Sequence, residues 1–466
     1  MSNLFNNELT TRGKSSLQDK LVRFWWLRAA LFLLVCFAIV FPFTKTDKDT
    51  PIDSSEKKEI VAEPVIEKLP EPEVKSEPAP KVEPPKRIPT ISIGKDTDVR
   101  KTLKGFSLKY EANFEEGGRA SEERVEKESY AVNFSLNVKV PTPATTAEEL
   151  ADINPHLTEM LPGLKDLTDN AKVSPYYNML YAKKQDRLKR DMFKLDKLLT
   201  SHNFYDCETM LEMKHPDTGR EVFLFQADMD VVTDGSDGDR LSVMSDEVVH
   251  STYYQPTTSY SWKKATDKPN PMVVGFEQRV KNADAELAQA STSASRKSWL
   301  KSRRKYLIDT IAEMKRRSYL VAKHDPFIVI SVDKIYGARS QEHIPGVGDY
   351  VAVVYKDKIY PAICGDGGPT FKAGEGSLRL AKTINPIATS YHRPVSTLGV
   401  TYIVFPGSAP SPKRAPDYDV WYEQTSKLLD EIGGLGEGYK LHRWENTFPV
   451  EEDLDEEEEE TIETSE

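Results

Sequence analysis

Residues 359–381 read IYPAICGDGGPTFKAGEGSLRLA, and this stretch decides the fold expected for the centre of the chain. Its apolar opening is typical of a buried strand, and glycine and proline then end the run. A short loop leads to an amphipathic run at 378–381. Asp366 and Glu375 therefore stand nine positions apart between glycines, at the mouth of a strand or helix, where a bulky ligand can approach the backbone closely.

The sequence on both sides of this stretch predicts further strands and several helices. Period-2 alternation at 106–114 and 130–140 predicts two strands with one buried face. Apolar residues at helical spacing predict helices around 181–199, within an insertion at 275–321, and at 417–432. Further strands are expected at 221–226, 327–332, 349–355, 358–364 and 399–405. The expected fold class is α+β: a mainly antiparallel β core with helical insertions, preceded by one transmembrane helix and a Pro-rich linker.

The N-terminal part contains one segment that is long and apolar enough to cross a membrane. Residues 24–43 carry a single charge, at Arg28, and a helix of that length spans about 30 Å, the thickness of a hydrocarbon core. Basic residues precede it, so the positive-inside rule puts the N-terminus in the cytoplasm and everything after Phe43 in the periplasm or at the cell exterior. A cleaved signal peptide is the alternative, because the apolar run 29–41 suits one, but no small-x-small cleavage site follows.

Two segments of biased composition flank the folded body. Residues 44–92 are rich in Pro, Glu and Lys with almost no aromatic residues, which is typical of an extended linker that cannot bury a core. The formal net charge of the chain is −11, and residues 451–466 hold 11 carboxylates without Lys or Arg. The remainder is therefore neutral, and charge does not support a nucleic-acid partner.

No motif indicates a metal site or a cofactor. The sequence has no CxxC and no Cys/His cluster, and neither a Rossmann glycine fingerprint nor a P-loop is present. Cys207 and Cys364 either pair in an oxidising compartment or are two small buried thiols. We therefore expect no cofactor and no metal.

The carboxylate pair suits the hydrolysis of glycosidic bonds. That reaction needs two carboxyl groups of unequal pKa, one holding a proton for the leaving oxygen and one ionised. Spacing in the sequence does not distinguish the wider separation of inverting enzymes from the shorter one of retaining enzymes. The alternative is that Asp366 and Glu375 only accept hydrogen bonds from backbone amides of the turns.

The segments Gly365–Pro369 and Gly374–Ser377 resemble the chitosanases of glycoside hydrolase family 75. The resemblance extends over roughly Asn203 to Pro410 and includes the strand that ends in Phe405-Pro406-Gly407-Ser408. It implies endo-hydrolysis of β-1,4-linked glucosamine polymers (chitosan), with inversion and without a cofactor. It also implies that Glu375 is the general acid and Asp366 the general base.

An Asp-rich segment at 226–240 invites three interpretations. Asp228, Asp230 and Asp234 form a subsite for the ammonium groups of glucosamine, or hold calcium, or belong to an acidic surface loop. The calcium reading is weakened because Val232 occupies a position where an EF-hand needs Asp or Asn. We expect these three aspartates and Ser377 to be substrate-binding residues.

Two other classes of function remain open. One is a polysaccharide-binding module that kept the hydrolase fold without turnover, and the other is a membrane-anchored structural protein of the envelope. The basic side of the helical insertion is either a solvated face or a contact with anionic polymer or lipid. The expected organisation is a cytoplasmic N-terminus (1–23), a transmembrane anchor (24–43), the linker (44–92), an accessory β-hairpin plus helical region (93–200), a chitosanase-like catalytic domain (201–440) and an acidic disordered tail (441–466).

Overall fold

The computed structural model describes residues 119–125, 135–201, 205–331 and 344–449. All of them belong to the second of two compact units, Ile88–Glu466. The anchor predicted at 24–43, the linker and the acidic residues from 451 onward lie outside the described residues, so these expectations stay predictions. Within the described ranges, no helix combines the length and the apolar character needed to cross a membrane.

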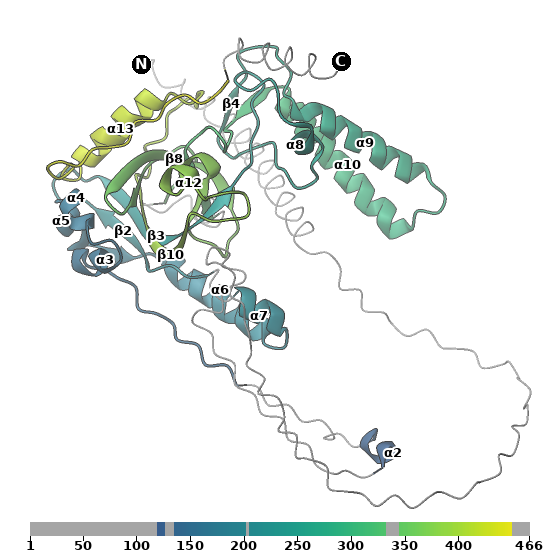
Figure 1. Ribbon diagram of the computed structural model, residues 1–466, viewed down its shortest axis with the longest axis horizontal. Coiled ribbons are helices and arrows are strands. Elements are labelled where there is room, and N and C mark those ends of the chain that lie inside the picture. Colours follow the sequence, from purple (N-terminus) through teal and green to yellow (C-terminus); the bar gives the residue numbers. More distant parts are fainter. Residues whose placement is uncertain (1–118, 126–134, 202–204, 332–343, 450–466) are drawn as a thin grey trace, which may run out of the picture. The chain divides into compact units, whose positions relative to one another are not determined.

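One eight-stranded sheet forms the centre of the unit (Figure 1). Its strands in spatial order are β1 (Lys172–Val173), β2 (Thr209–Lys214), β3 (Glu221–Val232), β10 (Val395–Val404), β7 (Tyr350–Tyr355), β8 (Lys358–Gly368), β6 (Phe327–Ser331) and β9 (Glu375–Ser377). Most neighbours are antiparallel; β6–β8 and β3–β9 are parallel. The expected α+β class with a mainly antiparallel core is confirmed.

The sheet closes on itself through the three-residue strand β9. β9 pairs with β6 on one side and with β3 on the other, so the strands from β3 to β9 form a barrel-like ring. Asp230 lies beside Glu375 in the parallel β3–β9 register. Closure therefore brings the Asp-rich segment against the second carboxylate of the 359–381 stretch.

Side chains of the strands alternate between two buried faces. In β7, Tyr350, Ala352 and Val354 join one hydrophobic cluster, while Val351 and Val353 join the other. Because both faces are covered, the strand reads as a continuous apolar run rather than an alternating one.

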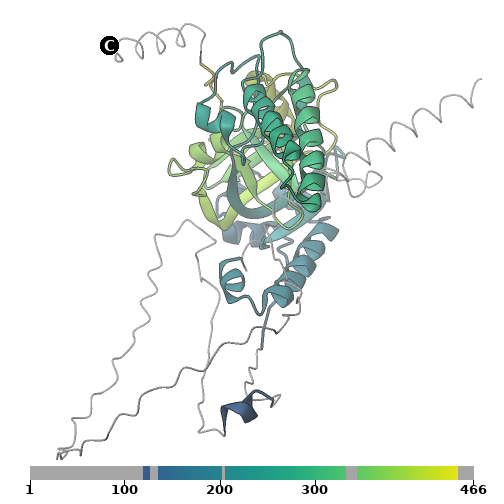
Figure 2. The same cartoon turned by 90° about the vertical axis from the view of Figure 1, so that its right-hand side faces the viewer.

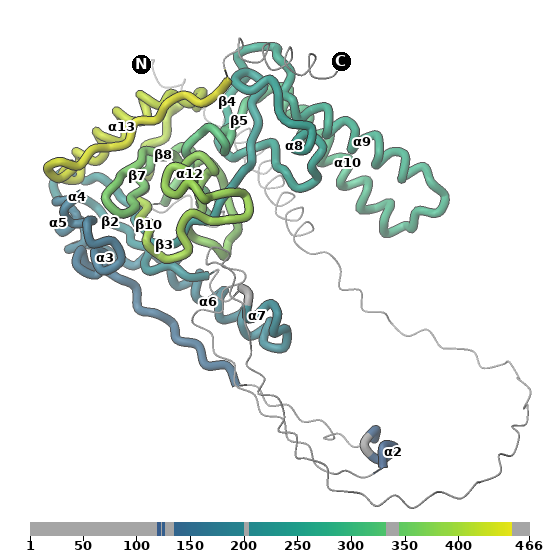
Figure 3. The backbone as a smooth tube through the Cα atoms, viewed as in Figure 1, coloured from purple at the N-terminus to yellow at the C-terminus, as the bar shows by residue number. Residues whose placement is uncertain are grey.

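Helices cover both faces of the sheet, and the reader can trace their connections along the backbone tube in Figure 3. α3 (Ala147–Ile153), α4 (Leu157–Met160), α5 (Leu164–Thr168) and α13 (Tyr418–Asp430) contribute to the first cluster. α6 (Pro175–Asp191) and α12 (Leu378–Ile384) contribute to the second. The remaining short helices are α2 (Ala120–Glu123), α7 (Leu195–Ser201) and α8 (Asp246–His250).

The predicted helical insertion is a hairpin of two helices, α9 (Met272–Ala288) and α10 (Ala294–Met314), which lie side by side in Figures 1 and 2. The short strands β4 (Ser261–Lys263) and β5 (Arg317–Tyr319) pair at its base. Several basic side chains of α10 pair with acids of α9, among them Arg296 with Glu286 and Arg304 with Asp284. This pairing agrees with a solvated charged face.

Two local expectations differ from the structure. Residues 135–140, predicted as part of a strand, are irregular, and Val138 and Val140 are exposed, because no neighbouring strand pairs with them. The alternating residues 106–114 lie outside the described ranges.

β8 also continues past 364 to Gly368, because β6 pairs with its end and Val329 lies opposite Asp366. Asp366 thus lies within a strand rather than after it. Cys207 and Cys364 are both buried.

Candidate active site

Asp366 lies near the end of β8 with one carboxylate oxygen surrounded by donors. Its Oδ1 accepts hydrogen bonds from the Ser259 amide (2.9 Å), the Ser259 hydroxyl (2.6 Å) and the Gly367 amide (2.7 Å). The side chain remains partly exposed. Burial raises the pKa of Asp366, while the hydrogen bonds from Ser259 and Gly367 act against the rise. These donors favour the ionised form of Asp366.

Glu375 opens β9 and lacks such donors. Among the described residues, no hydrogen bond to its carboxylate is found, and the side chain is partly exposed. Burial raises the pKa of Glu375; the charge of Lys372 opposes this, and the charges of Asp230 and Asp366 add to it. The two carboxylates therefore interact electrostatically, and of the two only Asp366 accepts hydrogen bonds from described residues that favour its ionised form.

Two glycines let the backbone come close to Glu375. Gly374 has φ +78°, and a Cβ there would lie 2.0 Å from the carbonyl oxygen of Asp228. At Gly368, a Cβ would lie 2.7 Å from Val329 Cγ1 and 3.1 Å from Glu375 Oε2. The glycines quoted from the sequence thus serve close packing around the carboxylate as well as access to it.

Asp228 and Asp230, on β3, are held by cations of the chain itself. Arg393, whose side chain is 5% exposed, pairs with Asp228 and, at 2.5 Å, with Asp230 Oδ1. Lys372 pairs with the other oxygen of Asp230. Burial alone would lower the pKa of Lys372, but the charges of Glu375 and Asp230 outweigh it and raise the pKa. These two aspartates form an internal charge network beside Glu375.

Asp234 follows β3 and faces the same region without a cation. Its Oδ1 receives only a long hydrogen bond from the Gln255 amide, 3.4 Å, and no ion pair to it is found in the described part of the chain. Burial, together with the charges of Asp366 and Glu375, raises the pKa of Asp234 to about 7. The structure therefore groups Asp234, Asp366 and Glu375 as three interacting carboxylates.

Ser377 lies beneath the site rather than in it. Its side chain is 0% exposed, and its hydroxyl accepts hydrogen bonds from the amides of Leu380 (3.3 Å) and Phe327 (3.2 Å). The first bond caps the N-terminus of α12, and the second ties β6 to β9. Ser377 thus fixes the backbone that carries Glu375.

Residues 229–438 match the family described as fungal chitosanase of glycosyl hydrolase group 75. This match covers a little under half of the chain and supports a chitosanase-like assignment for the matched range, which is called the group 75 domain below. The matched range contains both Asp366 and Glu375, and the resemblance seen in the sequence is confirmed. A search of curated proteins found no match to the chain. The group 75 domain is accordingly a chitosanase-like glycosidase domain.

Three residues of the group 75 domain contact the carboxylates but were missed by sequence reasoning. Ser259 lies more than one hundred positions before Asp366 and carries no local signal. Arg393 lies just before β10, more than one hundred and sixty positions after Asp228. Lys372 was visible as the cation in the loop between the two carboxylates, and its position there was the available clue.

The aspartates of the Asp-rich segment have different surroundings. Among the residues that the structure describes, no group of three or more His, Cys, Asp or Glu side chains is arranged to hold a metal ion. Asp237 and Asp239 point elsewhere: Asp237 pairs with Arg240, and Asp239 accepts hydrogen bonds from the amides of Ala265 and Thr266. The segment divides between a charge network, one cation-free carboxylate and loop-fixing contacts.

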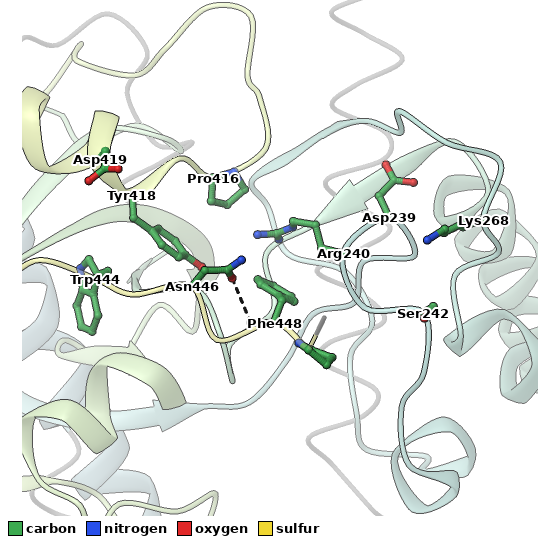
Figure 4. A pocket seen from close by; sticks show the side chains of 11 residues that line it. Asp239, Arg240, Ser242, Lys268, Pro416, Tyr418, Asp419, Trp444, Asn446 and Phe448 are labelled. Atoms are coloured by element: carbon green, nitrogen blue, oxygen red, sulfur yellow. Dashed lines mark hydrogen bonds between the residues drawn. The ribbon is translucent and has the colours of Figure 1, made fainter. Parts of the chain in front are cut away.

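A cavity of about 510 Å³ lies apart from the carboxylates (Figure 4). It is lined by Asp239, Arg240, Ser242, Lys268, Pro416, Tyr418, Asp419, Trp444, Asn446, Phe448 and Pro449. The guanidinium of Arg240 already pairs with Asp237 and Asp325. None of the predicted site residues lines this cavity, so it does not contain the candidate active site.

Proposed function

We propose that the chain is an endo-acting, inverting hydrolase of β-1,4-linked glucosamine polymers. In this proposal Glu375 is the general acid and Asp366 the general base. The observation that supports it is the unequal surroundings of two partly exposed carboxylates: Asp366 Oδ1 accepts three hydrogen bonds, whereas none to Glu375 is found in the described ranges.

The proposed reaction follows from these surroundings. Oδ2 of ionised Asp366 accepts a proton from water, and the water oxygen bonds to C1 of the sugar. The C1–oxygen bond breaks as protonated Glu375 gives its proton to the leaving oxygen. An inverting reaction places a water between base and sugar, which requires carboxyl groups about 6.5–9.5 Å apart.

Asp234 is the proposed contact for the substrate's ammonium group. It is the aspartate of the three predicted for this role that has no ion pair among the described residues, and it is partly exposed beside both working carboxylates. A bound ammonium supplies the positive charge that Asp234 lacks and favours its ionised form. Asp228 and Asp230 act behind it, through Arg393 and Lys372.

The test is the release of reducing ends from chitosan by the full chain and two variants. Asp366→Asn and Glu375→Gln each remove one titratable group at nearly constant volume, and we expect each to lose activity by about 10³-fold or more. Asp246→Asn, at a side chain that is 99% exposed, is the control and keeps full activity.

The result also separates the alternative functions. Full activity in both carboxylate variants contradicts the assignment. Binding of chitosan beads without turnover by the unaltered chain indicates the polysaccharide-binding module instead. Product analysis by proton NMR then reports the anomer formed first, and an initial β-anomer product contradicts inversion.

A further inference from the structure

The loop from Pro369 to Gly374 connects the two proposed catalytic residues. It leaves β8 after Gly368 and returns at β9, where Glu375 begins the strand. On one side the loop is tied to β3, because Lys372 pairs with Asp230. The position of Glu375 relative to Asp366 therefore depends on how this loop is held.

Helix α6 holds the other side of the loop. Lys183 Nζ donates a hydrogen bond of 3.3 Å to the carbonyl oxygen of Thr370. The guanidinium of Arg187 lies 5.3 Å from the ring centroid of Phe371, and the ring of Tyr205 lies 5.6 Å from the same centroid. Phe371 thus contacts both a cation and an aromatic ring, and each contact stabilises the position of its side chain.

Arg187 and Tyr205 are themselves fixed. Nε of Arg187 donates to the Tyr205 hydroxyl at 2.5 Å, and the Arg187 side chain lies 4.0 Å from Asp191 Oδ2. Tyr205 is 2% exposed, and burial raises its pKa, so its hydroxyl stays protonated. Both side chains that Phe371 contacts therefore have partners of their own.

The helix is fixed to the sheet by its other face. Ser174 caps its first turn and Pro175 occupies the first helical position. Tyr177 and Tyr181 are buried against β2 and β3, and the Tyr181 hydroxyl donates to the carbonyl oxygen of Cys207 at 2.9 Å. A displacement of α6 is thus opposed by the same cluster that supports the strands.

All of these supporting residues lie before residue 229, outside the range matched to group 75. We propose that α6 with Tyr205 is a positioning element of the active site, and that Arg187 acts through Phe371 to hold Glu375 opposite Asp366. The inference rests on the proposed function for its catalytic consequence. Without this support the loop gains conformational freedom, and a displacement of about 1 Å costs up to about 10²-fold in rate.

The experiment compares Arg187→Ala with Arg190→Ala in the full chain. Both variants remove one arginine from α6, but Arg190 is half-exposed and pairs only with Asp191 among the described residues. We expect Arg187→Ala to lower kcat on chitosan about 10- to 100-fold with a smaller change in KM, and Arg190→Ala to match the unaltered chain.

A double-mutant cycle tests whether Arg187 acts through Phe371. Phe371→Leu alone is expected to lower kcat as Arg187→Ala does, and the double variant to be no worse than either single variant. Phe371→Tyr, which keeps the aromatic ring, is expected to retain activity. Losses that multiply in the double variant, or equal kcat values for Arg187→Ala and Arg190→Ala, overturn the proposal.

Hydrogen–deuterium exchange of the segment 366–377 decides the point independently of turnover. We expect exchange there to be at least about 10-fold faster in Arg187→Ala and Phe371→Leu than in the unaltered chain or Arg190→Ala. Phe371 is partly exposed, so Phe371→Leu remains informative where Arg187→Ala fails to fold. Faster exchange in a chain that does not cleave chitosan supports the positioning role while refuting the proposed function, and unchanged exchange refutes the positioning role.

Discussion

Single residues in the site differ mainly in the partners that each carboxylate has. Asp366 accepts hydrogen bonds from three donors, and Asp228 and Asp230 are paired with cations. Among the described residues, Glu375 has neither kind of partner, and Asp234 accepts only the long hydrogen bond from the Gln255 amide. Burial raises the pKa of Glu375, which suits a group that must carry a proton near neutral pH.

Lys372 is expected to set the upper pH limit of the reaction. The charged groups facing Glu375 are Lys372, Arg393, Asp230, Asp366 and Asp234. Lys372→Met removes one positive charge, so the pKa of Glu375 rises and the acid keeps its proton to higher pH. We expect the alkaline limb of the kcat/KM profile to move upward by about one pH unit.

Lys372→Arg is the control for this prediction because it keeps the charge, and its alkaline limb stays near that of the unaltered chain. A downward shift in Lys372→Met, or an equal shift in both variants, contradicts the assignment of Glu375 as the acid.

Among the elements, the three-residue strand β9 has the largest consequence. β9 spans only Glu375–Ser377, yet it joins β3 to β6 and closes the ring of strands. The closure depends on Gly374, where the backbone has φ +78° and passes close to β3. Both the positive φ and the close approach to β3 disfavour a side chain at position 374, so adding one requires β9 to move.

Gly374→Ala is expected to open this closure. The new methyl group would lie 2.0 Å from the carbonyl oxygen of Asp228, so β9 must move and Glu375 with it. We expect a loss of about 2 kcal/mol or more in the free energy of unfolding and a loss of most activity.

Gly407→Ala is the matched control for the closure, since Gly407 has φ +76° and nothing lies within 4 Å of its added Cβ. Gly407→Ala introduces the backbone strain without a steric clash, and we expect it to lower the free energy of unfolding by about 1 kcal/mol. Denaturant unfolding and chitosan hydrolysis measure both variants, and equal effects at the two positions contradict a specific role for Gly374.

For the whole molecule, the loop after β3 is held by a buried ion network. Arg240 pairs with Asp237 at 2.5 Å and with Asp325 at 2.9 Å, and the Tyr418 hydroxyl donates to Asp325 at 2.8 Å. This network fixes the segment that carries Asp234 and keeps its cation-free carboxylate beside the working pair. Holding a carboxylate there costs stability when it ionises.

Asp234→Asn is expected to stabilise the protein at high pH. The pKa of this carboxyl rises from 3.8 to about 7 on folding, so the folded chain binds its proton more tightly than the unfolded chain. Its contribution to stability is therefore lost as pH rises from about 4 to about 7. We expect the free energy of unfolding of the variant to exceed that of the unaltered chain by about 2 kcal/mol at pH 8 and to equal it at pH 4.

Thermal and denaturant unfolding at the two pH values measure this effect, with Asp246→Asn as the exposed control. The same variant is expected to bind chitosan more weakly, because the proposed ammonium contact is gone. A stabilisation that is equal at pH 4 and pH 8 contradicts the raised pKa.

Local sequence patterns alone predict the strands of the core, the helical insertion and the two carboxylates of the proposed reaction. Apolar periodicity reports burial directly, and the glycines around Asp366 and Glu375 mark close backbone approach within one short stretch. Local patterns of this kind need no knowledge of distant residues. The extent of β8 was missed because its last residues pair with β6 in spite of their glycines.

Which charged groups contact one another depends on the tertiary structure. Arg393 reaches Asp228 and Asp230 across more than one hundred and sixty positions, which sequence spacing does not indicate. The same pairing separates these two aspartates from Asp234, although all three look alike in the sequence. The support of the Phe371 loop by α6 is likewise a contact between distant segments. These contacts result from the closure of the sheet, because the strand order brings β3, β8 and β9 together.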